Sequence, residues 1–512
     1  MEAMELHHHL QENPGVFPDK PKKVSVIETH ISYVFLTGRY AYKIKKPVNF
    51  GFLDFSTIKK RKEYCEKELS LNGRLSPDIY LQVLPITKNR ASYEFLGKGD
   101  VAEYCLQMKE LPQDRILTRL IKEGKCSAEI IDAISDILES FFSNADTTEA
   151  IRSFGNIDVI KKNTEENFEQ TKGYIGKTIE ETQYNLIAET TRKFIDRNAG
   201  RFQSRVDLGF IRDCHGDLHT GNIFVTDNTY IFDCIEFNDR FRYQDILSDI
   251  GFLSMDLDHL DRPDYARQLE KRFAKEEDKS LLFFYKCYRA YVRFKIACFQ
   301  LADNDTEELR LEAEQYAGLA TVYASSLRNL KPCMIILTGL SATGKSYWAR
   351  KLGKTFDIKV LRTDKIRKNL FEDCRSEGYG EGMYSDKARE HVYDKMLEYA
   401  KAELGSGRAI ILDATFEKEA YRKKARELAA GYDVPFVMIM TSCPDNSVSR
   451  RMEKRKDKPG LSQADYSVYE KQKHTYEIPA DVDVQLDTSS PKLKNAKIAL
   501  SKLYQMGLFA RL

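Results

Sequence analysis

Short apolar runs separated by turn residues mark the first part of the chain. Residues 33–36 and 41–44 are runs of the β type, and Thr37-Gly38 between them is typical of a turn that joins paired strands. A charged segment with a helical pattern follows at residues 56–75. The pattern predicts a small lobe over about residues 20–110, built from strands and one helix.

The middle of the chain is dominated by helical patterns. Residues 127–198 are polar and lack the alternation of strands, and aromatic-rich helical segments extend from residue 245 to about residue 329. Between them, residues 209–214, 223–225 and 230–232 predict short strands around a loop. We therefore expect a helical large lobe over residues 111–330, with a strand-bordered loop inside it.

Strand and helix patterns alternate regularly after Lys331-Pro332. Apolar runs at residues 334–337, 359–361, 409–412 and 436–440 predict strands separated by helical segments. This rhythm favours a parallel sheet covered by helices. The predicted fold class is therefore α/β and α+β in two domains, residues 1–330 and residues 331–512.

Composition adds limits on compartment and partners. A chain of 512 residues exceeds the size of one growing core, and a net charge of +2 does not require nucleic acid or an anionic membrane as partner. The ten cysteines include no Cys-x-x-Cys pair, which favours free thiols in a reducing compartment. The start of the chain lacks the pattern of a signal peptide, and no apolar run has the roughly 18 residues of a membrane span. We expect a cytoplasmic protein.

A glycine-rich motif follows the first strand of the C-terminal domain. Its residues are Gly339, Leu340, Ser341, Ala342, Thr343, Gly344, Lys345 and Ser346. In such a loop the backbone N–H groups surround phosphate oxygens, the lysine contacts the β- and γ-phosphates, and the hydroxyl coordinates Mg²⁺. The strand before it and the helical pattern after it provide the expected context, so we predict an ATP site here.

Charged residues near the ends of later strands complete the predicted C-terminal site. Asp364 is placed to accept the proton of an acceptor hydroxyl, and Arg367 to hold an acceptor phosphate. Asp413 ends the third strand near the phosphates and the metal. Arg451 and Arg455 lie on a segment that we expect to close over the nucleotide. A charged surface helix is the alternative interpretation of this last segment.

A second phosphotransfer motif lies in the N-terminal domain. In His215-Gly216-Asp217, followed by Asn222 and Asp233, the spacing is that of a kinase catalytic loop. The first aspartate orients the acceptor hydroxyl and accepts its proton, while the asparagine and the second aspartate hold Mg²⁺. The motif predicts a second ATP site, separate from the first.

The nucleotide lysine of this site is expected upstream. Lys43 and Lys45 lie on the same face of the predicted strand, so alternation does not choose between them, and we favour Lys43. Glu68 is its expected partner on the next helix, with Glu63 as the alternative. Residues 103–108 are the expected hinge beside the adenine.

These motifs resemble two kinase groups. The motif His215-Gly216-Asp217, with glycine at its middle position, resembles that of aminoglycoside phosphotransferases and choline kinases. The predicted site residues of the C-terminal domain resemble those of gluconate kinase-like and polynucleotide kinase-like P-loop domains. Residues 42–48 and 51–55 resemble a bacterial family that fuses the two domains. This resemblance implies a bilobal protein kinase-like fold followed by a P-loop fold. It also implies a supporting role for Asp249.

The predicted function is that of a bifunctional phosphotransferase using ATP and Mg²⁺. Both sites would phosphorylate hydroxyl groups of small molecules, and two alternatives are kept. One is a nucleotide-sensing regulator in which one domain controls the other, and the second is a polynucleotide 5′-hydroxyl kinase activity of the C-terminal domain, which is not favoured. A basic stripe of Lys286, Arg289 and Arg293 is either an anionic acceptor pocket or a solvated helix edge. The oligomeric state and the acceptors are left open.

Overall fold

The computed structural model describes residues 2–51, 53–89, 92–371, 383, 385–456 and 466–510. The chain divides into two compact units. The first unit comprises Met1–Glu165 and Asn198–Arg289, and the second comprises Glu166–Arg197 and Ala290–Leu512.

A six-stranded antiparallel sheet begins the first unit, with the order β1-β2-β3-β6-β4-β5. Its strands are β1 (Ser25–Glu28), β2 (Ser32–Leu36), β3 (Tyr40–Lys45), β4 (Tyr80–Asn89), β5 (Ser92–Phe95) and β6 (Asp100–Lys109). Helix α1 (Glu2–Glu12) contributes Leu6 and Leu10 to a core that contains Phe35 and Tyr42 of the sheet. The predicted strand pair at residues 33–36 and 41–44 is confirmed as β2 and β3.

Helix α2 (Ile58–Asn72) packs against β4 and β6. The Thr57 hydroxyl caps its first turn by accepting the Lys60 N–H. Arg61 of this helix is buried and its Nε donates to Glu103 Oε2 at 2.8 Å. Because Glu103 lies inside β6, the expectation of a hinge at residues 103–108 is wrong: this stretch belongs to a central strand, in which Cys105 and Leu106 are fully buried.

Helices and two small strand pairs form the rest of the first unit. The helices are α3 (Leu117–Lys122), α4 (Ala128–Asn144), α5 (Glu149–Arg152), α8 (Ala199–Asp207), α9 (Asp239–Arg242), α10 (Ile246–His259) and α11 (Pro263–Phe273). Strand β7 (Ile211–Asp213) pairs with β10 (Tyr243–Asp245), and β8 (Ile223–Val225) pairs with β9 (Thr229–Ile231). One apolar core joins α3, α4, α10 and α11 to β8 and β9, so the short strands are anchored in the helical lobe.

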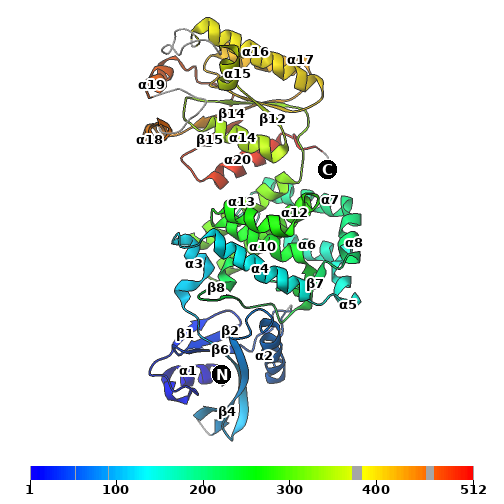
Figure 1. Cartoon of the computed structure of the whole chain (residues 1–512), viewed down its shortest axis with the longest axis vertical. Coiled ribbons are helices and arrows are strands. Elements are labelled where there is room, and N and C mark those ends of the chain that lie inside the picture. Colours follow the sequence, from blue (N-terminus) through cyan, green and yellow to red (C-terminus); the bar gives the residue numbers. More distant parts are fainter. Residues whose placement is uncertain are drawn as a thin grey trace. The chain divides into compact units, whose positions relative to one another are not determined.

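The second unit contains a five-stranded parallel sheet with the order β12-β13-β11-β14-β15. Its strands are β11 (Met334–Thr338), β12 (Lys359–Arg362), β13 (Ile410–Asp413), β14 (Phe436–Ser442) and β15 (Val484–Asp487). Every residue of β11 and β13 is buried, as expected for strands covered on both faces. Figure 1 shows α16 (Asp386–Gly405) and α17 (Glu419–Gly431) on one face, with α14 (Lys345–Phe356) and α20 (Lys492–Gln505) on the other.

The remaining helices of this sheet domain are α15 (Thr363–Leu370), α18 (Asp445–Lys456) and α19 (Tyr466–Thr475). Two helices that precede the sheet in sequence, α7 (Glu181–Arg197) and α13 (Glu307–Ser326), belong to the same compact unit, and both pack against α20. Helices α6 (Ile157–Thr171) and α12 (Lys279–Asp303) have residues in both units. The predicted two-domain α/β and α+β fold class is confirmed, while the boundary between residues 330 and 331 stays a prediction.

Candidate active sites

A tight loop after β7 carries the first predicted motif. Gly216 has a φ of +89°, and a Cβ on this residue would lie 2.9 Å from the Phe241 carbonyl oxygen. Glycine is therefore required at this close approach. The loop brings Asp217 next to Asn222, whose Nδ2 donates to Asp217 O at 3.0 Å and to Asp217 Oδ2 at 3.2 Å. The predicted base and one predicted metal ligand are thus in direct contact.

Asp249 of α10 holds this loop from the buried side. Its carboxylate accepts the N–H groups of His215 at 2.7 Å and Gly216 at 3.0 Å, and burial raises its pKa. Burial lowers the pKa of His215, whose Nδ1 accepts the Asp217 N–H at 3.2 Å and whose Nε2 lies 2.9 Å from Phe232 O. A neutral His215 that donates through Nε2 satisfies both contacts, so it links the motif to the segment after β9.

Two lysines of β3 share one carboxylate of α2. Lys43 Nζ lies 2.7 Å from Glu68 Oε1, and Lys45 Nζ lies 2.6 Å from Glu68 Oε2. Lys43 also lies 2.9 Å from Asp233 Oδ1, whereas Lys45 also pairs with Glu236. Burial acts to raise the pKa of Glu68, but the two lysines lower it to about 2. The network keeps Glu68 ionised inside the protein.

Their second partners distinguish the two lysines. Lys43 faces Asp233, whose side chain is 45% exposed and whose φ of +63° is a strained value for a residue other than glycine. Lys45 is 1% exposed and lies between two buried carboxylates. Lys43 is therefore the lysine that contacts the predicted metal ligand. The alternative partner Glu63 is largely exposed and lies 4.0 Å from Lys59.

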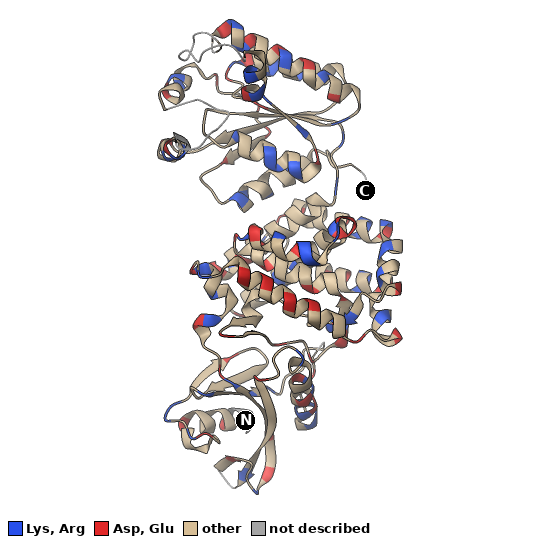
Figure 2. Cartoon of the chain, viewed as in Figure 1, with Lys and Arg blue, Asp and Glu red and all other residues tan. Residues whose placement is uncertain are grey.

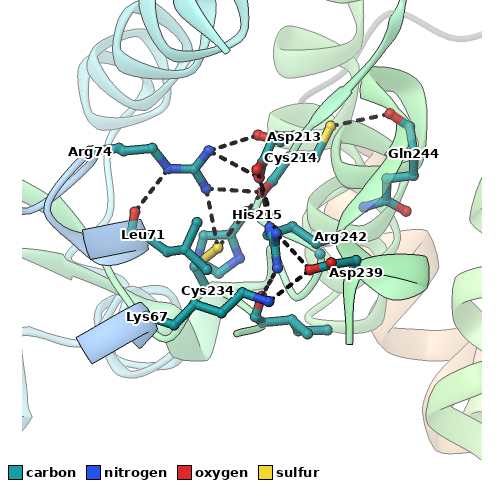
Figure 3. Close-up of polar contacts among 12 residues, drawn as sticks. Lys67, Leu71, Arg74, Asp213, Cys214, His215, Cys234, Asp239, Arg242 and Gln244 are labelled. Carbon is teal, nitrogen blue, oxygen red and sulfur yellow. Dashed lines mark hydrogen bonds and ion pairs between the residues drawn. The ribbon is translucent and has the colours of Figure 1, made fainter. Parts of the chain in front are cut away.

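A cluster of ion pairs, shown in Figure 3, joins α2 to β7 and α9. Arg74 Nη1 donates to Asp213 O at 2.9 Å, and Arg242 Nε donates to Asp213 Oδ1 at 2.7 Å. Asp239 accepts from Arg242 Nη2 at 2.9 Å and from Lys67 Nζ at 2.8 Å. Sequence reasoning missed this cluster because its contacts other than Arg242–Asp239 join residues 29 to 172 positions apart. It fixes strand β7, from which the loop that carries the first predicted motif begins.

Two of the three residues in the basic stripe on α12, Lys286 and Arg289, have neither of the two expected roles. Lys286 is buried and lies 2.7 Å from Asp258 and 2.6 Å from Glu270. Arg289 is also buried, and its Nε donates to Ser248 Oγ at 3.2 Å. Lys286 and Arg289 already have protein partners, which argues against an anionic acceptor pocket, and their burial excludes a solvated edge at these two positions. Arg293 is 29% exposed and lies 3.2 Å from Glu312.

The second motif forms a loop between β11 and α14. Gly339 and Gly344 have φ values of +130° and +104°, and Ala342 also has a left-handed φ of +61°. A Cβ on Gly339 would lie 2.3 Å from the Thr441 carbonyl oxygen. Lys345 Nζ lies over the loop and donates to Leu340 O at 2.7 Å. The contiguous loop, lysine and helix start have the arrangement that binds phosphate groups.

An arginine that sequence reasoning missed connects the carboxylates of this site. Arg362 is the last residue of β12 and is in register with Asp413 at the end of β13. Its Nε donates to Asp413 Oδ2 at 3.1 Å, and its Nη2 lies 3.4 Å from Ser346 Oγ and 3.5 Å from Asp364 Oδ2. Arg367 Nη1 lies 3.4 Å from Asp364 Oδ1. Burial raises the pKa of Asp364, with Arg367 and Arg362 opposing it.

Arg451 of α18 is fixed against the phosphate loop. Its Nη1 donates to Thr488 Oγ1 at 2.8 Å and lies 3.2 Å from Ala342 O, and its Nη2 donates to Thr488 O at 2.7 Å. These bonds hold the start of the predicted closing segment at the base of the loop. The side chain of Arg455 lies outside the described residues.

Comparisons with known proteins cover both halves of the chain. A family model described as "AAA domain" matches residues 334–479. The uncharacterized protein Rv2004c of Mycobacterium tuberculosis is 30% identical over 417 residues, which cover 80% of this chain and 81% of that protein. The chain belongs to the Rv2004c family.

Two further proteins resemble parts of this Rv2004c family member. An adenylyl-sulfate kinase of Pseudomonas aeruginosa is 30% identical over 174 residues, covering 32% of this chain and 82% of that protein. A solved choline/ethanolamine kinase family protein from Mesorhizobium loti is 14% identical, with a TM-score of 0.38, and covers 63% of this chain and 95% of that one. The C-terminal region of the family member is thus of the P-loop kinase type.

The described residues of this Rv2004c family member show mixed surface charge on α16 and α17, and neither a cluster of metal-binding side chains nor a membrane-spanning helix. Figure 2 shows Lys and Arg interspersed with Asp and Glu on α16 and α17, and Lys424 of α17 pairs with Glu390 and Asp394 of α16 at 3.2 Å and 2.9 Å. In the described part of the chain, no group of three or more His, Cys, Asp or Glu side chains is placed to hold a metal. The same residues include no helix long and apolar enough to cross a bilayer.

Proposed function

We propose that the chain is an ATP-dependent phosphotransferase with two separate nucleotide sites. Each site would transfer a γ-phosphoryl group to a hydroxyl group of a small molecule. The observation that carries the proposal is the double contact of Lys43, which reaches Glu68 and Asp233, 25 and 190 residues away. A lysine that joins a helix glutamate to a metal-binding aspartate is the arrangement that kinase-type sites use for ATP. The proposed domains are residues 1–330 and 331–512.

In the N-terminal site, we assign the proton transfer to Asp217. Its carboxylate would accept the proton of the acceptor hydroxyl as the oxygen attacks phosphorus. Asn222 donates its amide N–H groups to Asp217, so its amide oxygen is left as one metal ligand, and the exposed Asp233 carboxylate would be the other. These oxygen donors fit Mg²⁺, which would neutralise phosphate charge. Lys43 would leave Asp233 to contact the α- and β-phosphates while Glu68 keeps it in place.

In the C-terminal site, Asp364 would accept the acceptor proton. Its raised pKa makes it a stronger base than an exposed aspartate. The Ser346 hydroxyl and the Asp413 carboxylate form an oxygen donor pair that fits Mg²⁺. Lys345 would turn from Leu340 O to the phosphates. Arg362, which contacts both Ser346 and Asp413, would stabilise the negative charge that develops on the transferred phosphoryl group.

The relatives suggest acceptors for the first assays. Adenylyl sulfate, after which the Pseudomonas aeruginosa relative is named, is the first acceptor to try at the C-terminal site, followed by sugars, polyols and nucleosides. A polynucleotide acceptor is less favoured, because α16 and α17 carry both signs of charge and not a basic face. A nucleotide sensor is the remaining alternative, in which occupation of one site controls the other.

The proposal is tested with purified full-length protein, Mg²⁺ and γ-labelled ATP over this acceptor panel. We expect labelled product from at least one acceptor, and its loss in Asp217→Asn or Asp364→Asn identifies the site. A single-stranded oligonucleotide with a free 5′-hydroxyl tests the polynucleotide alternative. Failure to bind Mg-ATP, together with no transfer to any acceptor, would overturn the proposal.

A further inference from the structure

A cavity of 540 Å³ lies in the second compact unit, away from the phosphate loop. Helices α7 and α20 and the segments at residues 328–331 and 507–509 line it. Its lining includes none of the residues assigned above to either nucleotide site. The volume is in the range of small-molecule sites.

The cavity wall contains a buried guanidinium with unused donors. Arg328 has a side chain only 4% exposed, and its Nη2 donates to Ala510 O at 2.8 Å. Its Nε and Nη1 have no hydrogen-bond partner among the described residues. Burial lowers the pKa of Arg328, which nearby Glu189 and Tyr504 only partly offset. Leaving buried donors of a charged group without acceptors costs free energy, so an acceptor that binds Nε and Nη1 of Arg328 would be stabilising.

The nearest carboxylate does not supply that acceptor. Glu189 Oε2 lies 3.9 Å from Arg328 Nη1, beyond hydrogen-bond distance. The same oxygen accepts the Tyr504 hydroxyl at 2.6 Å, and Glu189 Oε1 pairs with Lys193. Its charge is therefore directed to other groups. Because Nε and Nη1 of Arg328 are buried, an anion would reach them only after neighbouring side chains move, and Glu189, which is 35% exposed and 3.9 Å from Nη1, is one of these neighbours.

Two further cations, the Glu181 carboxylate and several neutral groups complete the lining. Lys193 and Lys331 line the same cavity, and Lys331 uses one donor on Gly507 O at 2.7 Å. Gln505 Nε2 donates to Thr182 Oγ1 at 2.9 Å on the polar wall. The three cations outnumber the two carboxylates of the lining, Glu181 and Glu189, which favours an anionic ligand. Arginine and lysine together suit the several oxygens of a phosphate, and the amide and hydroxyl groups suit a hydroxylated body.

We propose that this cavity binds a small phosphate-bearing metabolite whose oxygens accept from Nε and Nη1 of Arg328. The site would be separate from both nucleotide sites, and its occupation would not depend on either proposed reaction. Glu189 would compete with the ligand, because its carboxylate lies beside the same guanidinium. Removing that charge should therefore strengthen phosphate binding, whereas removing the guanidinium should weaken it.

The test is a calorimetric titration with inorganic phosphate at constant ionic strength. It uses the full chain carrying Lys345→Ala, which removes the phosphate-loop lysine as a competing anion site. We expect saturable binding that Arg328→Gln weakens at least tenfold and Glu189→Gln tightens severalfold. Sulfate should compete with phosphate, and acetate should not. Lys497→Gln is the matched control, because Lys497 pairs with Glu180 at 3.3 Å and is absent from the lining.

Two results would overturn the proposal. One is the absence of saturable phosphate binding, and the other is an equal affinity in the Arg328→Gln and Lys497→Gln proteins. Competition by acetate as strong as that of sulfate would contradict the assignment to phosphate. If Arg328→Gln does not fold, Lys331→Gln and Glu189→Gln decide the question, and unchanged affinity in both rejects the site.

Discussion

The two proposed nucleotide sites are built in opposite ways. The N-terminal site depends on pairs of side chains from distant segments, as in the Lys43–Asp233 contact across 190 residues. The C-terminal site depends on the backbone of one contiguous loop, in which Gly339, Ala342 and Gly344 have positive φ values. The first should therefore be most sensitive to the loss of a charge partner. The second should be most sensitive to a change in backbone freedom.

The largest effect on stability is expected from Lys45→Met in the N-terminal site. This change leaves Glu68 and Glu236 without a shared buried partner, and breaking such a pair costs about 3–5 kcal/mol. Native-state hydrogen exchange of the β3 and β6 amides measures the loss. Lys46→Met is the matched control, because Lys46 pairs with the exposed Glu28 and its replacement should change the opening free energy far less.

Lys43→Met should affect transfer more than folding. Removing the lysine that faces Asp233 is expected to reduce N-terminal phosphotransfer roughly 10²- to 10³-fold, because one charge-stabilising donor is lost. Steady-state kinetics of the Lys43→Met and Lys45→Met proteins measure the difference. A larger loss of kcat per folded molecule in Lys45→Met would reverse the assignment of the two lysines.

Gly339→Ala tests the backbone side of the comparison. A Cβ at this position meets Thr441 O at 2.3 Å and needs a φ of +130°, so we expect a cost of about 1–3 kcal/mol and loss of C-terminal nucleotide binding. Gly407→Ala is the control, since its φ is +67° but a Cβ there meets nothing within 4 Å. Equal nucleotide affinity in the two variants would show that the loop tolerates a side chain.

The smallest expected effect is a shift in pH dependence. Burial raises the pKa of Asp364, so the ionised base is lost at a higher pH than for an ordinary aspartate. On the acid side of the profile (its acid limb), kcat/KM for C-terminal transfer should therefore fall at a higher pH than it would with an exposed aspartate as the base. Arg367→Gln removes a cation that opposes this shift, and it should move the limb further up. A limb that moves down would contradict the assigned cause.

The sequence was sufficient for parts of the molecule whose pattern is local. Strands β2, β3, β8 and β11 follow from apolar runs, and the phosphate loop follows from one motif. Residues 103–108 suggest a hinge only because a lone apolar run does not reveal which strands flank it. Arg362 was missed because its role arises from the register of two parallel strands.

The pairing of side chains from distant segments was the second feature that the sequence could not predict. Alternation puts Lys43 and Lys45 on one face of β3. Only the fold reveals that their second partners differ, because Lys43 pairs with Asp233 and Lys45 pairs with Glu236. The same holds for Lys286, whose burial against Asp258 and Glu270 no helical spacing could predict. The grouping of α7 with the C-terminal sheet likewise depends on packing against α20, which is distant in sequence.

The most direct test of two independent phosphotransferase sites is a comparison of Asp217→Asn, Asp364→Asn and the double variant. Each protein is assayed for transfer from γ-labelled ATP to the acceptors that the unmodified chain uses. We predict that each single variant loses one set of products by about 10²-fold or more, retains the other set, and that the double variant loses both. Loss of all products in either single variant would contradict the account and favour a sensor that couples the two sites.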